Sequence, residues 1–330
     1  MIAVITNEIE LDSVDLPAGL EMRGCRDEPS AIDATIDEDT EILVADAMPT
    51  NMERCSGLRW IQLLSAGCNQ LVGHPLLARD LQITNASGTN AVYIAEFVVA
   101  QLLAHTKGLR EFDRLQQAVI WPDDRMPLAR PSLRGMCAVI VGYGAIGRET
   151  ARLLAALGLR IIAVSSSAAR KPYQGYAPFD EFGDPASQLP ERIVATADMG
   201  TVLPEADVVV LAVPLLPATQ HLIDAAALAS MKPSAILFNV ARGPVVDTVA
   251  LVGVLDHGQL AHAYLDVFET EPLPVESRLW LHPRVSITPH ITGTMPNHPR
   301  RLGDLFLQNL ARYRNGQPLL NRVDRHALRS

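Results

Sequence analysis

Three charged or titratable side chains stand close behind apolar runs in the last third of the chain. Arg242 follows "AILFNVA", Glu271 comes shortly after "HAYLDVF", and His290 ends "RVSITPH". Such runs predict parallel strands, whose carboxyl ends meet at one edge of a sheet, where ligands bind. An arginine fork matches the two oxygens of a carboxylate, and histidine exchanges protons near neutral pH. These residues therefore predict a proton-transfer site for an anionic substrate.

A glycine-rich turn lies upstream, in "AVIVGYGAIGRETARLLAAL". Its first glycine permits a tight turn, the second lets the backbone approach a pyrophosphate, and the third lets the helix pack against the strand. The amides of the helix N-terminus would then face the phosphates. Arg148 either adds charge there or points to solvent. The expected dinucleotide-binding residues are Gly142, Tyr143, Gly144, Ala145, Ile146 and Gly147.

The next predicted strand, "RIIAV", ends in "SSSAARK", where a dinucleotide site commonly carries an acid. That acid binds the ribose diol and repels a 2′-phosphate, and no Asp or Glu follows here until Asp180. Serine hydroxyls donate to phosphate oxygens, and an arginine fork grips a phosphate. Ser165, Ser166 and Arg170 therefore favour NADP(H) over NAD(H); the alternative is a solvated loop with incidental basic residues.

The positioning elements form two series. Short apolar runs recur from residue 1 to about 88, and six more begin at Met136, with helix-length segments between them. This rhythm predicts an α/β fold of two βα domains, the second doubly wound. Residues 90–117 have helical spacing and predict one long helix. Residues 171–200 form an unusually long connection, which we interpret as a surface insertion, with a flap beside the adenosine end of a cofactor as the alternative.

Composition excludes several classes of protein. A chain of 330 residues suggests two domains, and a formal charge of −9 argues against a nucleic-acid surface. The four cysteines show no paired spacing, so neither a disulfide framework nor a metal site is indicated. The first residues, "MIAVITNEIELD", lack a signal peptide's features, and no apolar run approaches the roughly 20 residues that span a bilayer. We expect a cytoplasmic protein without a membrane partner.

Further segments extend these motifs: "LLSAGCNQL", "GTNAVYIAEFVVAQLL", "LPEADVVVLAVPLLPATQHLID", "MKPSAILFNVARGPVVD", "LDVFETEPLP" and "TPHITG". In this order they resemble the D-isomer-specific 2-hydroxyacid dehydrogenase family along nearly the whole chain. The resemblance implies a Rossmann-type doubly wound cofactor domain at residues 100–290. Residues 1–99 and 291–330 would together form a discontinuous, flavodoxin-like substrate domain.

The resemblance also implies a role for each motif residue. His290 would exchange a proton with the substrate oxygen, Glu271 would hydrogen-bond to it and raise its pKa, and Arg242 would bind the carboxylate and polarise the carbonyl. Asp266 would support the nicotinamide end of the cofactor. The backbone groups that would hold the substrate carboxylate are those of Ala66 and Gly67. The residues that would line the cofactor cleft are Val213, Pro214, Thr219, Val240 and Ala241.

The implied activity is hydride transfer between NAD(P)H and a small 2-oxo acid, with glyoxylate or hydroxypyruvate favoured, in a homodimer to which residues 90–117 contribute. Phosphite oxidation is an alternative, and so is a non-enzymatic, NAD(H)-sensing corepressor-like role. Formate oxidation is disfavoured, because that branch lacks the Glu–His pair. Purely structural roles are a further alternative, with Arg242 in a scaffold salt bridge, Asp266 as a cap and His290 satisfied at a strand end.

Overall fold

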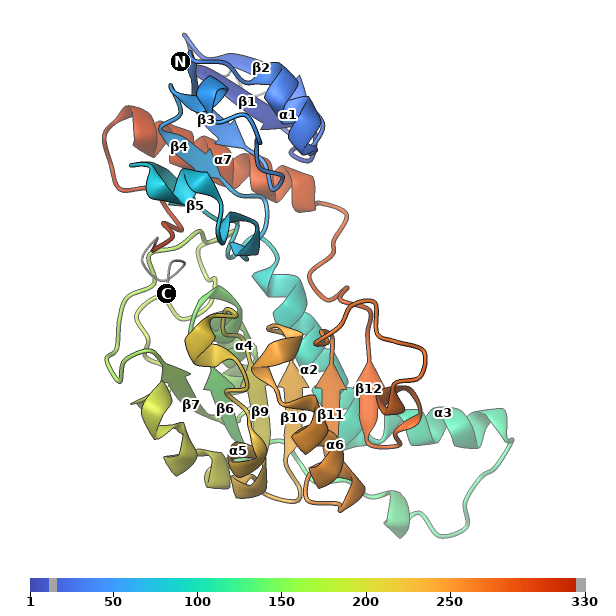
Figure 1. The fold of residues 1–330 in the computed structure, drawn as a ribbon. Helices are drawn as coiled ribbons and strands as arrows, with labels where there is room; N and C mark the ends of the chain where they lie inside the picture. The colour runs from blue at the N-terminus through green and yellow to red at the C-terminus, as the bar shows by residue number, and fades with distance from the viewer. Residues whose placement is uncertain (12–16, 325–330) are drawn as a thin grey trace. The chain divides into compact units, whose positions relative to one another are not determined.

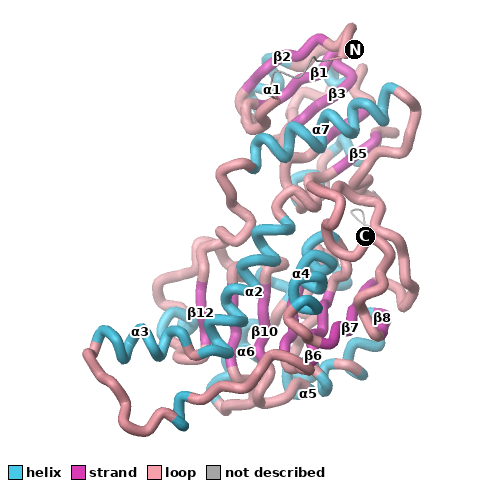
Figure 2. Tube along the Cα trace, turned by 180° about the vertical axis from the view of Figure 1, so that it is seen from behind, coloured by secondary structure: helices cyan, strands magenta, loops and turns pink. Residues whose placement is uncertain are grey.

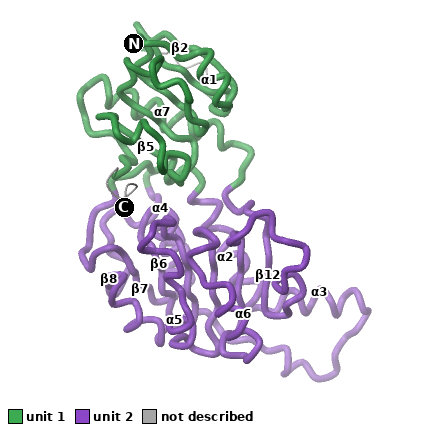
Figure 3. The backbone as a smooth tube through the Cα atoms, in the orientation of Figure 1, with its two compact units in different colours: residues 1–90, 174–180, 294–330 green, residues 91–173, 181–293 purple. Residues whose placement is uncertain are grey.

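The computed structural model describes residues 1–11 and 17–324, and it divides into two compact units (Figure 3). Unit 1 comprises residues 1–90, 174–180 and 294–330; unit 2 comprises residues 91–173 and 181–293. Each unit contains a parallel sheet covered by helices, which confirms the predicted α/β class. The units differ from the predicted domain boundaries at residues 91–99 and 291–293, which lie in unit 2, and at residues 174–180, which lie in unit 1.

Unit 1 has a five-stranded parallel sheet in the order β2-β1-β3-β4-β5 (Figure 1). Its elements are β1 (Ile2–Thr6), β2 (Glu21–Cys25), α1 (Pro29–Thr35), β3 (Thr40–Val44), β4 (Trp60–Gln62), β5 (Gln82–Thr84) and α7 (His298–Arg314). One face of the sheet packs on α1 through Ile32. On the other face, Trp60 stacks on Phe306 of α7, with ring centroids 5.7 Å apart. The C-terminal helix thus completes the core that the N-terminal strands begin.

Unit 2 has a seven-stranded parallel sheet in the order β12-β11-β10-β9-β6-β7-β8. Its strands are β6 (Cys137–Val141), β7 (Arg160–Ser165), β8 (Arg192–Ala195), β9 (Val208–Leu211), β10 (Ile236–Asn239), β11 (His262–Leu265) and β12 (Val285–Ile287). Its helices are α2 (Ala91–Lys107), α3 (Leu109–Gln117), α4 (Ala145–Ala156), α5 (Ala225–Ser230) and α6 (Thr248–Asp256). Helices α2 and α4 cover one face, and α5 and α6 cover the other (Figures 1 and 2). The strand order reverses between β6 and β9, the kind of switch point where open α/β sheets bind ligands.

Two details differ from the sequence predictions. The single helix expected over residues 90–117 is interrupted at Gly108, whose left-handed φ of 68° ends α2 before α3 begins. Helical spacing continues across this glycine, so periodicity alone did not reveal the break. The connection expected over residues 171–200 contains β8, a short edge strand in which Arg192 is exposed and the other three residues are partly buried.

None of the described helices combines the length and the apolar character needed to cross a membrane.

Candidate active site

Two predicted catalytic residues and one predicted cofactor residue follow three neighbouring parallel strands of unit 2. Arg242 comes after β10, Asp266 directly after β11, and His290 after β12. The structure joins His290 to Glu271, because His290 Nδ1 lies 2.7 Å from Glu271 Oε2. The strand ends therefore place the predicted proton-transfer pair at the carboxyl edge of the sheet.

The glutamate of this pair is held at both oxygens. Glu271 Oε1 accepts the backbone N–H of Phe268 at 2.9 Å, while Oε2 faces the imidazole. A carboxylate acceptor at Nδ1 fixes the histidine tautomer and leaves Nε2 for a substrate. The side chains of His290 and Glu271 are 46% and 36% exposed, so small molecules have access to both.

Asp266 holds the loop that carries the histidine. It is only 3% exposed, and its carboxylate accepts the Thr288 hydroxyl at 2.6 Å, the Ile291 N–H at 3.0 Å and the Thr292 hydroxyl at 2.5 Å. The His290 N–H donates to the Asp266 carbonyl at 2.8 Å. The support for the nicotinamide end that the resemblance implies stays a prediction; the contacts themselves make Asp266 an anchor of the His290 loop.

Arg242 is not a scaffold ion pair. Across residues 1–11 and 17–324 it joins no salt bridge, and Nη1 donates to the Ala241 carbonyl at 2.7 Å. Its other N–H groups remain for an anion. The following residue, Gly243, was missed by the sequence reasoning. A Cβ there would lie 1.8 Å from the Phe268 carbonyl carbon. Only glycine therefore allows the backbone after Arg242 to pack this closely against the backbone at Phe268.

The glycine-rich turn has the geometry that its spacing predicts. It joins β6 to α4, and Gly142 has a φ of 101°, where an added Cβ would lie only 2.5 Å from the Ala212 carbonyl oxygen. A Cβ at Gly147 would lie 2.0 Å from the Gly142 carbonyl oxygen, whereas the space at Gly144 is open. Gly144 caps α4 without a side-chain acceptor, which leaves the first amides of the helix for a phosphate.

The predicted 2′-phosphate residues are partly engaged with the backbone. Ser165 Oγ donates to the Ser167 carbonyl at 2.5 Å, while Ser166 is exposed. Arg170 donates through Nη1 to the Ser187 carbonyl and through Nη2 to the Pro190 carbonyl at 2.6 Å. The guanidinium therefore braces the connection between β7 and β8, and binding a phosphate would require its remaining donor or an exchange of partners.

The other predicted cofactor residues lie behind β9 and β10. Thr219 Oγ1 donates to the Pro214 carbonyl at 2.7 Å and accepts the Leu216 N–H at 2.8 Å, which closes the turn after β9. Val213 packs partly buried against the core, and Val240 and Ala241 are 6% and 4% exposed. Within the turn after β6, Tyr143, Ala145 and Ile146 also pack into the core of unit 2.

In unit 1, the predicted carboxylate-binding loop follows β4 and depends on Asp46, which the sequence reasoning missed. Asp46 Oδ1 accepts the Leu64 N–H at 2.9 Å, the Ser65 N–H at 3.1 Å and the Gln70 amide at 2.8 Å. Burial raises the pKa of the Asp46 carboxyl above its usual range. The only sequence signal was its position behind the apolar run "EILVA". Ala66 and Gly67 lie half-buried in the loop that Asp46 holds.

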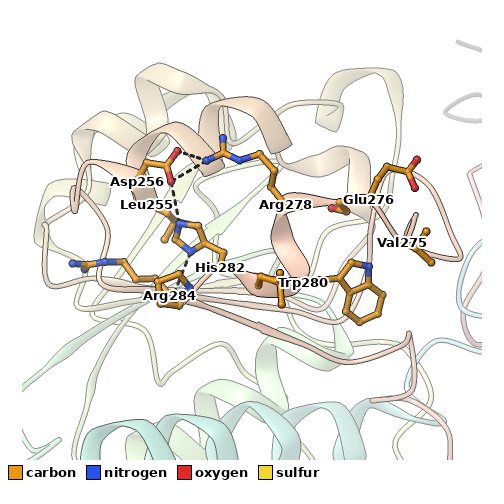
Figure 4. Close-up of a pocket in the computed structure, with 11 residues that line it drawn as sticks. Leu255, Asp256, Val275, Glu276, Arg278, Trp280, His282 and Arg284 are labelled. Atoms are coloured by element: carbon orange, nitrogen blue, oxygen red, sulfur yellow. Dashed lines mark hydrogen bonds and ion pairs between the residues drawn. The ribbon is translucent and has the colours of Figure 1, made fainter.

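The hollow in Figure 4 lies elsewhere in unit 2. Its lining includes Asp256, at the end of α6, and Arg284, just before β12, so it opens toward the amino ends of the strands. Asp256 pairs there with Arg278 at 3.0 Å and with His282 at 3.4 Å. The lining contains no predicted site residue. The described part of the chain also contains no group of three or more His, Cys, Asp or Glu residues that could hold a metal.

Comparison with known proteins agrees with this geometry. Residues 99–292 match the model of the D-isomer specific 2-hydroxyacid dehydrogenase, NAD binding domain. The chain belongs to this family. The resemblance seen in the motifs is therefore confirmed, and the protein is an NAD(P)-dependent oxidoreductase of the 2-hydroxyacid dehydrogenase type.

Similar proteins have more than one substrate. The chain is 32% identical to glyoxylate reductase of Thermofilum pendens, over 93% of this chain and 85% of that protein. It is 34% identical to (S)-sulfolactate dehydrogenase of Chromohalobacter salexigens, over 79% of each chain. The solved structure of an NADPH-dependent glyoxylate/hydroxypyruvate reductase from Sinorhizobium meliloti, in complex with NADP and sulfate, is 26% identical over 99% of each chain, with a TM-score of 0.79.

Proposed function

We propose that this dehydrogenase reduces a small 2-oxo acid, glyoxylate or hydroxypyruvate, to the D-2-hydroxy acid with NADPH as the reductant. The observation that carries the proposal is the 2.7 Å contact between His290 Nδ1 and Glu271 Oε2, at the same sheet edge as an arginine outside any ion pair in the described chain. A reductase substrate of this kind offers a carboxylate to the arginine and a carbonyl oxygen to the histidine. The names of similar proteins support the choice of substrate.

Each residue then has a step to perform. Arg242 binds the substrate carboxylate through the N–H groups that it does not donate to the Ala241 carbonyl. A dinucleotide held at the glycine-rich turn would supply the hydride for the carbonyl carbon. His290 donates a proton from Nε2 to the carbonyl oxygen, and Glu271 stabilises the imidazolium before transfer. The neutral imidazole then regains a proton from solvent, which readies it for another turnover.

The preference for NADP(H) rests on the strand end of β7. No acid stands there to repel a 2′-phosphate, and Ser166 is exposed beside Ser165. The double variant Ser165→Asp, Arg170→Ala should shift the kcat/KM ratio toward NADH. An unchanged NADPH/NADH ratio would show that these residues do not read the ribose.

An initial-rate matrix tests the chemistry. NADPH and NADH are each combined with glyoxylate, hydroxypyruvate, pyruvate and the 2-oxo acid of sulfolactate. His290→Ala and Arg242→Ala should each lower kcat/KM by about a hundredfold or more with the preferred pair. Near-wild-type turnover in either variant would refute the assignment. Oxidation of phosphite instead, or dinucleotide binding without any turnover, would favour the two alternative functions.

We further propose a homodimer that acts in the cytoplasm. Helix α3 and the segment after it extend from the sheet of unit 2 (Figures 1 and 2). Both carry exposed apolar side chains. Val119, Trp121 and Met126 are 91%, 84% and 77% exposed there. A second copy of the chain would remove this apolar surface from water. Light scattering behind gel filtration should give twice the chain mass, and a monomer at micromolar concentration would contradict the proposal.

A further inference from the structure

Arg148 is the least expected feature beside the glycine-rich turn. It stands in the first turn of α4, yet it is only 6% exposed and points neither to solvent nor into an open anion site. Its Nε donates to the Tyr143 carbonyl at 3.1 Å, and its Nη2 donates to the Lys171 carbonyl at 2.8 Å. Its Nη1 donates to the Asp184 carbonyl and to Ser187 Oγ, the latter at 2.8 Å. One buried guanidinium thus joins the turn to both ends of the loop between β7 and β8.

A second link runs from the same loop to the same turn. Tyr143, the residue between the first two glycines, donates its hydroxyl to Asp184 Oδ2 at 2.7 Å. The Asp184 carboxylate also accepts the N–H groups of Gln188 at 2.8 Å and Leu189 at 3.0 Å. Asp184 is 5% exposed, so these bonds are shielded from water. The conformation of the glycine-rich turn is therefore tied to residues about 40 positions away in sequence.

The middle of the loop has its anchor in unit 1. Residues 174–180 belong to that unit, and Tyr176 is 1% exposed within its core. The Tyr176 hydroxyl donates to Asp304 Oδ2 of α7 at 2.7 Å, and its N–H donates to Asn321 Oδ1 at 3.0 Å. The chain thus passes from unit 2 into unit 1 and back between β7 and β8. The predicted surface insertion carries one of the largest fully buried side chains of the protein.

We propose that Arg148 and Asp184 are positioning residues for dinucleotide binding, and that Tyr176 anchors the loop through which they act. The proposal rests on the proposed function, because it assumes that the glycine-rich turn receives the pyrophosphate. The turn must hold its amides in one arrangement to bind phosphate. The loop between β7 and β8 holds the turn in this arrangement through Arg148 and Asp184. Neither side chain needs to contact the dinucleotide to do so. Releasing the loop at either end then weakens dinucleotide binding.

Asp184→Asn tests the link, with Asp207→Asn as a matched control. Asp207 accepts the Cys137 N–H at 2.8 Å and Lys232 Nζ at 2.7 Å, at the opposite end of β6 from the glycine-rich turn. Both changes remove one charge and weaken buried or half-buried hydrogen bonds. We expect Asp184→Asn to raise the NADPH dissociation constant about tenfold. The same variant should raise the KM for NADPH by a larger factor than it lowers kcat. Asp207→Asn should change the NADPH dissociation constant less than about twofold.

Tyr176→Phe and Tyr313→Phe test the anchor. Each removes one phenol hydroxyl from a bond to a carboxylate of unit 1, because Tyr313 donates to Glu41 Oε1 at 2.8 Å. Only the first bond fixes the loop. Tyr176→Phe should raise the NADPH dissociation constant about threefold, and Tyr313→Phe should leave it unchanged.

Hydrogen exchange of the dinucleotide-free protein tests the positioning role of Asp184 separately from the proposed function. Amides of residues 142–147 should exchange faster in Asp184→Asn than in Asp207→Asn. Equal exchange and equal NADPH affinity in these two variants would overturn the positioning role, and equal affinity in the two tyrosine variants would overturn the anchor. A wild-type protein that binds no dinucleotide would instead refute the proposed function, whatever the exchange rates.

Discussion

Acidification should weaken unit 2 through a histidine remote from the catalytic pair. His262 begins β11 at the amino end of the strand, is 9% exposed, and has Nε2 2.8 Å from Ser286 Oγ. The pKa of His262 is lowered to about 3, mainly by burial and in addition by positive charge at His105 and Arg110. The His105 ring lies 5.1 Å from it, and burial lowers the pKa of His105 as well. Arg284 and His282 add positive charge from the segment before β12.

The magnitude follows from proton linkage. The folded pKa of His262 lies below the ordinary value of 6.5, so the unfolded chain takes up the proton first as the pH falls. The contribution to stability is therefore complete above about pH 7 and is lost progressively between about pH 6.5 and pH 3. Between about pH 7.5 and pH 5, His262 alone should lower the free energy of unfolding by about 2 kcal/mol.

Urea unfolding at these two pH values measures the loss. His262→Gln removes the titrating group, so its free energy of unfolding should depend on pH less than that of the wild type, by about 2 kcal/mol. The packing lost in the variant lowers its free energy of unfolding equally at both pH values, so it cancels when the two pH dependences are compared. His257→Gln, at an exposed histidine just after α6, should keep the wild-type dependence. Equal pH dependence in His262→Gln and the wild type would refute the reasoning.

Three further changes test the site. Glu271→Gln keeps a hydrogen bond to His290 but removes the charge, so kcat should fall about tenfold to a hundredfold, and an unchanged kcat in steady-state assays would contradict the role of Glu271. Asp46→Asn should raise the KM for the 2-oxo acid about tenfold and leave the KM for NADPH unchanged, because it loosens only the loop behind β4; equal changes in both constants would argue against this role. Gly243→Ala should lower the free energy of unfolding by about 3 kcal/mol, because its Cβ would overlap the Phe268 backbone, and a thermal midpoint equal to that of the wild type would contradict the packing.

Residues at strand ends were predictable because their placement follows from a local rule. A buried parallel strand has a recognisable apolar sequence, and every strand of the sheet delivers its next residues to the same edge. The placement of Arg242 and His290 follows from this rule, whereas the Glu271–His290 contact was expected from the family resemblance and the Gly142 turn from the glycine spacing. The rule does not predict where a helix breaks inside a continuous helical pattern. Gly108 was therefore predicted to lie within one helix.

The sequence by itself determined the α/β class, the family, and the positions of the candidate catalytic residues, since each depends on a short pattern. Only the tertiary structure decided what Arg148, Asp46 and Asp184 do. Their partners lie up to about 40 residues away, in loops without periodicity, so no local pattern specifies which donor meets which acceptor. The place of Tyr176 in the core of unit 1 likewise arises from burial of one aromatic side chain in a loop that sequence patterning assigns to the surface.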